Sequence, residues 1–400
     1  MASSKWITFS ELIDINRDRP IVFWGASSWI EKTLSHESLN VSHVVDNSQF
    51  NQGITYDGYP VKSPSTLKSE TERFYIVITT VNYMSVIDEL HEMGFVMGTD
   101  FCCTPLLNHR AHKDDLLSLD MNVLIASPVH HQTESTGGGL YVLNVSTSQI
   151  TKVATGKMRG IAQFKNEIYA VDMLRGIVVF NQSFEEQSVI PFEKNTEPHG
   201  ICIDESSSQL FIAQPGRDSV AVYSLIDREY KAEIFISDKW LRNKKDNHHI
   251  NDLCVHDGSL FVSMFSFSGN WSNECYDGGV IEIDLETREV IGPVISNLWM
   301  PHSVMRHNGK LLCLDSMRGD VVSMNHQKQG GFSGFARGLD VMKNYYVIGM
   351  SEHRYPEKLT DKVGHISLDS GVVIFDTASK LSKFYALNEA ESIHSLMILN

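Results

Sequence analysis

The chain has 400 residues, of which 42% are hydrophobic and 21% are charged, so it is long enough for two or three globular domains and is not disordered as a whole. Its 34 Lys and Arg residues and 49 Asp and Glu residues give a net charge of −15 at pH 7. Because an acidic chain is short of the cations that neutralise phosphates, we expect neither a nucleic acid nor a membrane surface as its partner.

The cysteines and the first residues indicate the compartment. The 6 cysteines are spread along the chain without a CxxC pair, which is typical of neither a zinc ribbon nor a disulfide framework. The first residues contain no long apolar segment of the kind found in signal peptides, and no run of 18 apolar residues is present to cross a membrane. We therefore expect a cytoplasmic protein.

Strands and helices are predicted to alternate in the first 110 residues. This alternation is typical of a parallel sheet with helices packed on it. The apolar segments predicted as strands are 21–24, 41–45 and 74–79, and the segments predicted as helices are 29–34 and 83–93.

Two of these strands end at residues that could bind a nucleotide. Gly25 follows the first strand, and Asp46 lies 21 residues later at the end of the second. This is close to the spacing between a phosphate-binding loop and a ribose-binding acid. The GxGxxG fingerprint is absent, because Gly25 stands alone and is followed by Ser27 and Ser28 without a later glycine. Gly25 can therefore equally be a simple turn residue.

The sequence VDNSQFNQG at 45–53, followed by YDGYPV at 56–61, resembles the small N-terminal nucleotide-binding half-domains of bacterial sugar acetyltransferases. The resemblance covers roughly residues 18–105. It implies a Rossmann-like domain over residues 1–112 that binds a nucleotide or nucleotide-sugar. The residues implied in that binding are Gly25, Ser27 and Asp46.

A β-rich unit recurs after residue 120, where the helical signal disappears. Its copies begin at intervals of 35 to 57 residues, which matches one four-stranded propeller blade of about 40–50 residues. The sixth copy has one strand only, and residues 122–154 contain three strands without a preceding first strand. Joined, they complete one blade and leave no open sheet edge. The six copies begin at Arg159, His199, Asn251, His302, Arg337 and His394.

We therefore predict a two-domain α/β plus all-β protein. Residues 1–112 form the Rossmann-like sheet and residues 113–119 the linker. Residues 120–400 form a six-bladed β-propeller that the C-terminal strand closes. The innermost strands of a propeller all begin at one face, so the six starting residues are expected to form a ring around the axis.

Histidines occupy alternate positions of this ring. His199, His302 and His394 begin the second, fourth and sixth copies, so three imidazoles are expected about 120° apart. Three protein nitrogens with an open fourth position are typical of catalytic zinc sites, where the open position activates water. We predict a divalent metal here, with zinc foremost. The alternative is that these histidines cap the inner strands and bond to the backbone.

Arg159 and Arg337 occupy two further ring positions. Each guanidinium offers a rigid fork for a carboxylate or phosphate, so both are candidate anion-binding residues. The alternative is a buried ion pair with Asp172, Asp252 or Asp340.

Three long loops are predicted on the same face as the ring, at 127–138, 264–278 and 350–370. Long loops at a propeller mouth form walls around it. Most of their polar residues are expected to be solvated, but each is also a candidate general acid or base. These residues are His130, His131, Glu134, Glu274, Tyr276, Glu352, His353 and Tyr355.

The sequence PHSV at 301–304 with LCLDSMRGDVV at 312–322 resembles the NHL-type six-bladed propellers, in particular the peptidyl-hydroxyglycine lyase domain of peptide amidation. It is also similar to bacterial propellers fused to sugar-pathway domains. The lyase resemblance implies that His199, His302 and His394 hold zinc and that Arg159 binds substrate. That family also uses a catalytic tyrosine. Because Asn251 is the third ring residue here, a loop residue such as Tyr276 would have to serve.

The expected function is that of a metal-dependent lyase or hydrolase in a sugar or secondary-metabolite pathway. Its substrate would be small, polar and anionic, and no oligomeric state is implied. The alternative is a non-catalytic, ligand-binding or scaffold propeller with a nucleotide-binding N-terminal half. A third option places catalysis in the N-terminal half. The candidate catalytic residues are Arg159, Arg337, Tyr276, Asn251 and Glu352.

Overall fold

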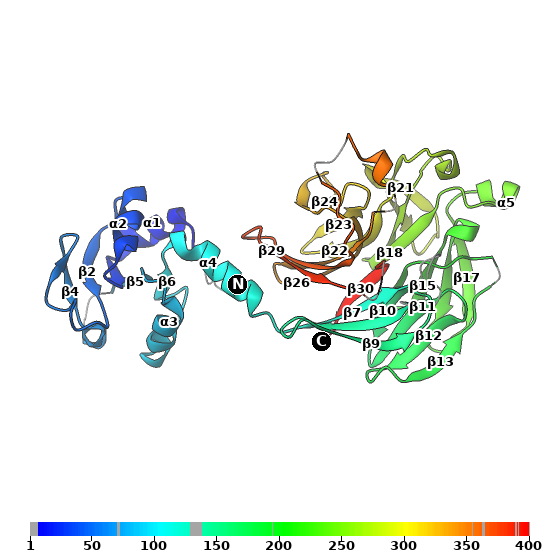
Figure 1. The fold of residues 1–400 in the computed structure, drawn as a ribbon. Coiled ribbons are helices and arrows are strands. Elements are labelled where there is room, and N and C mark those ends of the chain that lie inside the picture. Colours follow the sequence, from blue (N-terminus) through cyan, green and yellow to red (C-terminus); the bar gives the residue numbers. More distant parts are fainter. Residues whose placement is uncertain are drawn as a thin grey trace. The chain divides into compact units, whose positions relative to one another are not determined.

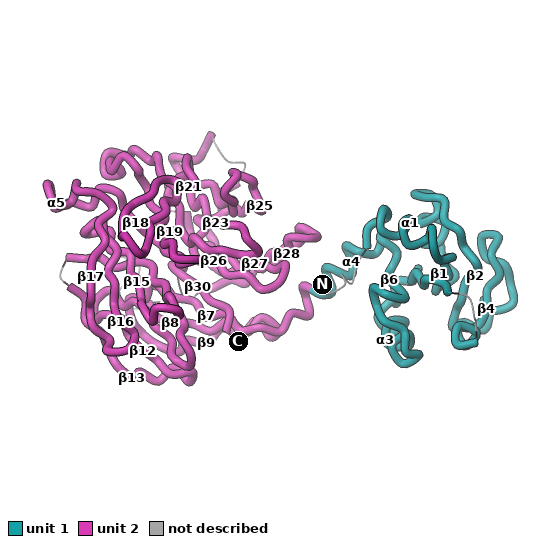
Figure 2. Tube along the Cα trace, turned by 180° about the vertical axis from the view of Figure 1, so that it is seen from behind, with its two compact units in different colours: residues 1–115 teal, residues 116–400 magenta. Residues whose placement is uncertain are grey.

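The computed structural model describes residues 7–69, 73–128, 138–193, 195–353, 355–361, 365–388, 390 and 392–399. The chain divides into two compact units, residues 1–115 and residues 116–400, which Figure 2 shows in different colours. The helix α4 (Asn108–Leu117) occupies most of the segment that we expected as a linker. Within the described segments, no helix is both long and apolar enough to cross a bilayer.

The N-terminal unit contains a mixed sheet in the order β3-β4-β2-β1-β5-β6. The pairs β1–β2, β1–β5, β2–β4 and β5–β6 are parallel, and β3 and β4 form an antiparallel hairpin. The expected parallel sheet is therefore present in part. The strands are β1 (Ile21–Trp24), β2 (Val41–Val45), β3 (Thr55–Tyr56), β4 (Tyr59–Lys62), β5 (Tyr75–Ile78) and β6 (Phe101–Cys103).

Helices cover both faces of this sheet, since alternate residues of a strand point to opposite faces. In β1, Val22 and Trp24 pack in one apolar cluster with residues of α3 (Tyr83–Glu92). Phe23 packs in a second cluster with residues of α1 (Phe9–Asp18) and α2 (Ser28–His36). All four residues of β1 are buried, as expected for a strand with helices on both sides.

The C-terminal unit is a six-bladed β-propeller, in which the described residues form six four-stranded antiparallel sheets. The first three blades are consecutive in the chain. Blade 1 contains β10 (Met158–Phe164), β11 (Glu167–Asp172), β12 (Gly176–Asn181) and β13 (Glu186–Ile190); blade 2 contains β14 (Ile201–Asp204), β15 (Gln209–Gln214), β16 (Ser219–Ser224) and β17 (Tyr230–Phe235); blade 3 contains β18 (Ile250–His256), β19 (Ser259–Met264), β20 (Gly278–Asp284) and β21 (Val290–Leu298).

The next two blades follow the same order, and the sixth combines two distant parts of the chain. Blade 4 contains β22 (His302–His307), β23 (Lys310–Asp315), β24 (Asp320–Ser323) and β25 (Lys328–Gly331); blade 5 contains β26 (Phe335–Met342), β27 (Tyr345–Ser351), β28 (Gly371–Asp376) and β29 (Ser382–Ala386); blade 6 contains β30 (Ser395–Leu399), β7 (Asn122–Ser127), β8 (Gly139–Asn144) and β9 (Gln149–Thr155).

The propeller closes where β30 pairs with β7. The two strands are antiparallel, from Ser395 opposite Ala126 to Leu399 opposite Asn122, and Figure 1 shows them side by side at the centre. Each inner strand contacts the inner strands of both neighbouring blades, in the closed order β10, β14, β18, β22, β26, β30. The six-bladed propeller and its closure by the C-terminal strand are therefore confirmed.

The propeller core lies between the blades. Among the described residues, six apolar clusters each join two neighbouring blades. Between blades 1 and 2, for example, Ile177 packs in one cluster with Leu210. Strands that are apolar on both faces are what such stacking of sheets requires.

Candidate functional site

The inner strands are irregular at the positions that face the axis. In β10, β18, β22 and β26 the pairing with the next strand shifts register over two residues near the strand's start. Such a bulge turns a side chain out of the regular alternation. The residues skipped by the pairing include Arg159, Asn251 and Arg337, so the bulges explain why these side chains leave the packed faces of their sheets.

Glycines bring neighbouring inner strands close together. A Cβ atom added to Gly160 would lie 2.6 Å from the backbone oxygen of His199, and one added to Gly200 would lie 2.6 Å from that of Asn251. Real Cβ atoms do not come this close to a backbone oxygen, so larger residues would push blades 1, 2 and 3 apart. The narrow centre of the propeller depends on these two positions.

The six predicted starting residues do meet at the axis, and we call them the central ring. Five of them line one cavity of about 10 Å³, which holds about one water molecule. The sixth, Arg337, donates from Nη1 to Nε2 of His394 at 2.7 Å. The described residues that line the cavity are Arg159, Gly160, His199, Gly200, Asn251, Asp252, His302 and His394.

One half of the central ring is covered, and the other half is partly exposed. Asn251, His302 and Arg337, from blades 3, 4 and 5, are 1%, 5% and 6% exposed. Arg159 and His199, from blades 1 and 2, are partly exposed, as is His394 of blade 6. Among the described residues, the side of blades 6, 1 and 2 is therefore the more accessible one, and residues 129–137 of the blade 6 loop lie outside them.

The cover over blades 3 to 5 is apolar. Its buried members, which we call the apolar cover, are Phe265, Met300, Met317, Phe335 and Leu359. Phe265 and Phe335 contact the ring of His302 edge-on, with centroids 5.4 and 5.6 Å away. The imidazole of His302 is thereby shielded from water on both sides.

Two of the cover residues, Phe265 and Leu359, lie in long loops that are joined by an ion pair. Lys358 Nζ lies 2.7 Å from Oε1 of Glu274. Lys358 also lies 5.4 Å from the centroid of the Tyr276 ring, and Tyr276 and Tyr355 both pack against the apolar cover. These candidate loop residues therefore lie at the edge of the apolar cover.

The loop candidates Glu352 and His353 lie away from the cavity. Neither Tyr276 nor Glu352 is among the described residues that line it. Glu352 is exposed, and its backbone N–H donates to Ser370. His353 is buried, with Nε2 3.2 Å from the backbone oxygen of Met317. His130, His131 and Glu134 lie outside the described residues.

His199 is held in one orientation by Asn251. The amide nitrogen of Asn251 donates to the backbone oxygen of His249 at 3.0 Å, so its Oδ1 faces Nδ1 of His199 at 2.9 Å. Because Oδ1 can only accept, the proton of His199 lies on Nδ1 and Nε2 carries a lone pair. Burial, the charge of Arg159 and the neighbouring His249 lower the pKa of His199 well below its usual value. His199 is therefore a neutral acceptor.

His302 and His394 bond differently. Nδ1 of His302 lies 3.0 Å from the backbone oxygen of Met300 and 2.8 Å from Oγ of Ser316. Nε2 of His394 accepts from Arg337. The alternative to a metal site was that these histidines bond to nearby backbone. This alternative describes His302 in part.

The three predicted metal ligands come together, but they do not fit a metal in this arrangement. The rings of His199 and His394 lie 6.3 Å apart, and His302 lines the same cavity. Metal-binding histidines must point a lone pair at the ion, whereas that of His394 Nε2 accepts from Arg337. Across the described chain, no three His, Cys, Asp or Glu side chains are grouped so that they could hold a metal ion.

The carboxylates that we weighed as arginine partners have backbone partners. Asp172 accepts from the N–H of Leu174, and Asp340 from the N–H of Ile398. Asp252 accepts from the N–H of Ser303 at 2.7 Å. Burial raises the pKa of Asp252 to about 6, although the charge of Arg337 acts in the opposite direction.

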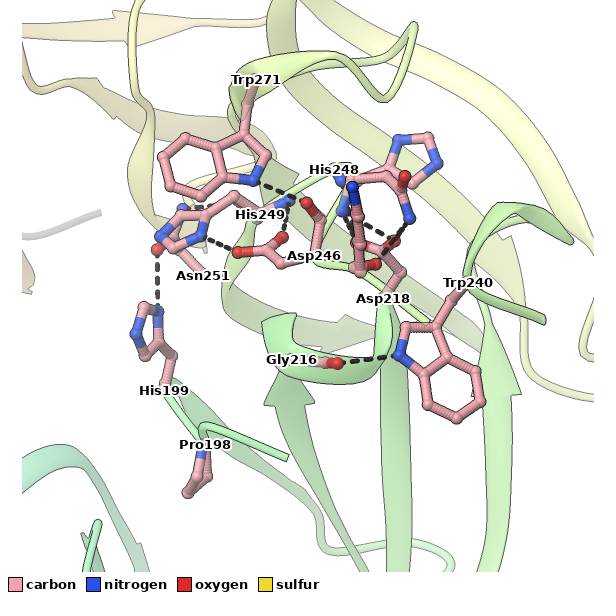
Figure 3. Close-up of polar contacts among 12 residues, drawn as sticks. Pro198, His199, Gly216, Asp218, Trp240, Asp246, His248, His249, Asn251 and Trp271 are labelled. Atoms are coloured by element: carbon pink, nitrogen blue, oxygen red, sulfur yellow. Dashed lines mark hydrogen bonds and ion pairs between the residues drawn. The ribbon is translucent and has the colours of Figure 1, made fainter. Parts of the chain in front are cut away.

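A fourth imidazole, that of His249, lies beside the central ring and was not among the predicted site residues. His249 lies in the loop before β18, with its ring centroid 5.3 Å from that of His199. Its Nδ1 is 2.5 Å from Oδ2 of Asp246, and Trp271 lies across its ring (Figure 3). The only signal in the sequence was a His-His pair directly before an inner strand, outside the repeated unit.

The N-terminal candidates hold their own loop together. Oδ2 of Asp46 accepts from the N–H of Ala26 at 2.7 Å, and Oδ1 accepts from the N–H of Ser48 at 2.8 Å. The hydroxyl of Ser27 donates to the backbone oxygen of Thr79 at 2.5 Å and caps α2. Gly25 has a φ of +110°, which favours glycine. All three residues thus have structural roles in this turn.

Comparisons with known proteins bear on the propeller. A family described as a domain of unknown function (DUF4915) matches residues 233–397, and no curated protein matches the chain. A chain in the crystal structure of a nidogen/laminin complex is 12% identical with a TM-score of 0.50, covering 69% of this chain and 98% of that one. At this identity the likeness supports the fold alone.

Two further solved structures have lower scores. A luciferin-regenerating enzyme is 11% identical with a TM-score of 0.41, covering 60% of this chain and 78% of that one. The computationally designed Ika8 protein is 10% identical with a TM-score of 0.40, covering 71% of this chain and 94% of that one.

Proposed function

We propose that the propeller is an enzyme, a lyase or hydrolase, that binds a small anionic substrate at the partly exposed half of the central ring. The observation that carries the proposal is the charge at the axis. The positive charge of the central ring comes from the guanidinium groups of Arg159 and Arg337, and Asp252 is the one carboxylate among the described residues that line the cavity. In a chain with a net charge of −15, such a cationic centre attracts anions.

The partly exposed half offers both donors and an acceptor. Arg159 presents a guanidinium fork that matches a carboxylate or phosphate. A neutral His394 carries its proton on Nδ1, because Nε2 accepts from Arg337. The Nε2 atom of His199 is an acceptor. Together these groups suit a substrate that has an anionic oxygen and a nearby hydroxyl, which is the chemistry of hydroxy acids and sugar acids.

The other candidate residues would act indirectly. The cavity of about 10 Å³ is too small for such a substrate, which would lie over the ring. Arg337 and Asn251 are buried and orient His394 and His199, so we assign them positioning roles. Tyr276 and Glu352 have no part in the proposal. No step involves a metal, because Arg337 holds the His394 nitrogen that zinc would need.

Calorimetric titration with succinate, glycerate and inorganic phosphate tests the binding. Arg159→Gln should weaken binding of the preferred anion at least about tenfold, as expected for the loss of hydrogen bonds to a charged group. Arg175→Gln is the matched control, because Arg175 belongs to the same blade but pairs with Glu186 where both side chains are more than 40% exposed. Equal binding by wild type and Arg159→Gln would overturn the proposal.

The alternative function, a non-catalytic propeller with a nucleotide-binding N-terminal half, predicts that a bound acid is recovered unchanged. Mass spectrometry of hydroxy acids, their lactones and their phosphate esters after incubation with the protein separates the two. We expect conversion of at least one of them, and loss of that conversion in Arg159→Gln.

A further inference from the structure

Asp246 and His249 form a close carboxylate–imidazole pair beside the central ring. Oδ1 of Asp246 accepts the backbone N–H of His249 at 2.9 Å, and Oδ2 lies 2.5 Å from its Nδ1. The carboxylate therefore contacts both the backbone N–H and the imidazole of His249. Because the carboxylate accepts at Nδ1, the lone pair of a neutral His249 lies on Nε2.

The backbone of His249 is held in a strained conformation. Its φ is +49°, in the left-handed region that non-glycine residues rarely adopt. Its backbone oxygen accepts from Nδ2 of Asn251 at 3.0 Å and from the N–H of Phe265 at 3.2 Å. These two bonds hold the backbone of His249 in this conformation.

Two aromatic residues enclose the pair. The ring centroids of Trp271 and Phe265 lie 4.3 and 4.5 Å from that of His249. The indole N–H of Trp271 donates to the backbone oxygen of Asp246 at 3.1 Å (Figure 3). The side chains of Asp246 and His249 are each 16% exposed, so water is largely excluded while a small reactant can still reach the imidazole.

The pair lies beside His199, the residue of the central ring that carries a lone pair on Nε2. His249 contacts His199 edge-on at 5.3 Å, and Asn251 bonds to both residues. Burial, and after it the charge of Arg159, lowers the pKa of His199 well below its usual value, so His199 stays neutral. His249 instead has a carboxylate oxygen 2.5 Å from its Nδ1, which orients the imidazole and leaves Nε2 as the acceptor.

We propose that His249 is the proton acceptor of the reaction and that Asp246 is the residue that positions it. This inference rests on the proposed function, because the reacting anion is the one that Arg159 holds. In a hydrolysis, Nε2 of His249 takes a proton from water while the water oxygen bonds to the electrophilic carbon. The bond from that carbon to the leaving oxygen then breaks, and the leaving oxygen receives the proton back from Nε2.

Modification by diethyl pyrocarbonate, which acylates unprotonated imidazole nitrogens, tests the pair without a known substrate. Peptide mass spectrometry would follow His249 and the exposed His326 in the same sample. We expect His249 in the wild-type protein to react at least as fast as His326. Asp246→Asn should slow His249 about tenfold, because an amide no longer fixes the tautomer, while His326 is unchanged.

A protection experiment separates this inference from the proposed function. Succinate should slow the modification of His249 in wild type but not in Arg159→Gln. A reactive His249 without protection would overturn anion binding and leave the pair intact. An unreactive His249, or an unchanged rate in Asp246→Asn, would overturn the pair whatever Arg159 binds. If Asp246→Asn does not fold, the wild-type comparison with His326 decides.

Discussion

Arg337 and His394 come from neighbouring blades, and a hydrogen bond of 2.7 Å runs from Nη1 of the guanidinium to Nε2 of the imidazole. A guanidinium has donors only, so this nitrogen must present its lone pair to Arg337. The bond thus uses one of the three nitrogens that the expected zinc site needs and adds a fixed positive charge beside it. The bond links His394, the third of the alternately placed histidines, to Arg337, which the sequence predicted as an anion-binding residue.

Removing this guanidinium should create zinc affinity. We expect Arg337→Met to bind zinc at least about tenfold more tightly than wild type, since losses around metal ligands change affinity by 10- to 100-fold. Methionine can keep the packing on Phe335, whose ring lies 4.7 Å from the guanidinium. Competition with a chromogenic chelator measures the affinity. Stoichiometric zinc in wild type that His302→Ala removes would instead establish the three-histidine centre.

Ile393→Ala should destabilise the closure of the propeller. Ile393 is 0% exposed and packs in the cluster between blades 5 and 6. The lost burial and the cavity should lower the free energy of unfolding by about 2–4 kcal/mol. Ile226, which is 85% exposed, provides the matched control, and Ile226→Ala should change stability by less than about 0.5 kcal/mol. Equal urea midpoints for the two variants would contradict a packed closing blade.

Asp252 should make the propeller less stable as the pH rises from about 4 to 6. An unfolded Asp loses its proton near pH 3.9, whereas burial raises the pKa of Asp252 to about 6. Between these values the folded state holds the extra proton, so the free energy of unfolding falls with pH, by about 3 kcal/mol when complete. Asp252→Asn cannot titrate and should lack this fall. Urea denaturation at pH 4 and pH 7 measures the free energy of unfolding of both proteins. An equal change between these pH values in wild type and Asp252→Asn would contradict the prediction.

Asp46→Ala should destabilise the N-terminal unit whether or not it binds a nucleotide. The substitution leaves the N–H groups of Ala26 and Ser48 without their carboxylate acceptor, at a cost of about 1–3 kcal/mol. Calorimetry with UDP-glucose on the wild-type protein tests the separate prediction that Asp46 contacts a ligand hydroxyl. An unchanged melting transition in Asp46→Ala would show that the carboxylate does not hold the turn.

The sequence was sufficient for the propeller because its repeat is periodic. Each copy places a polar residue at the start of an inner strand, and the cyclic geometry then puts His199, His302 and His394 at one axis. The bulges in four inner strands have no such signature, although the glycines at 160 and 200 mark the close approach that accompanies them. The N-terminal sheet was predicted less completely, because the hairpin of β3 and β4 is short and has little apolar pattern.

The contacts within the central ring could not be derived from the spacing of the repeats in the sequence. Whether His394 faces a metal or Arg337 depends on side-chain directions, and the direction of Arg337 is set by the bulge in β26. His249 escaped detection because it lies in a loop between two repeats, where residues differ from copy to copy. The apolar cover combines loops of blades 3, 4 and 5, and such a cluster becomes visible only when the chain is folded.

The sixth blade combines β7–β9 with β30, and this has a consequence for biosynthesis. A ribosome makes Asn122–Ser127 long before Ser395–Leu399, so β7 must wait for its partner while the five intervening blades emerge. During that time its apolar edge is open to pairing with other chains. Completion of the propeller is therefore a late step, and the nascent β7 edge is the segment that a chaperone would most need to shield.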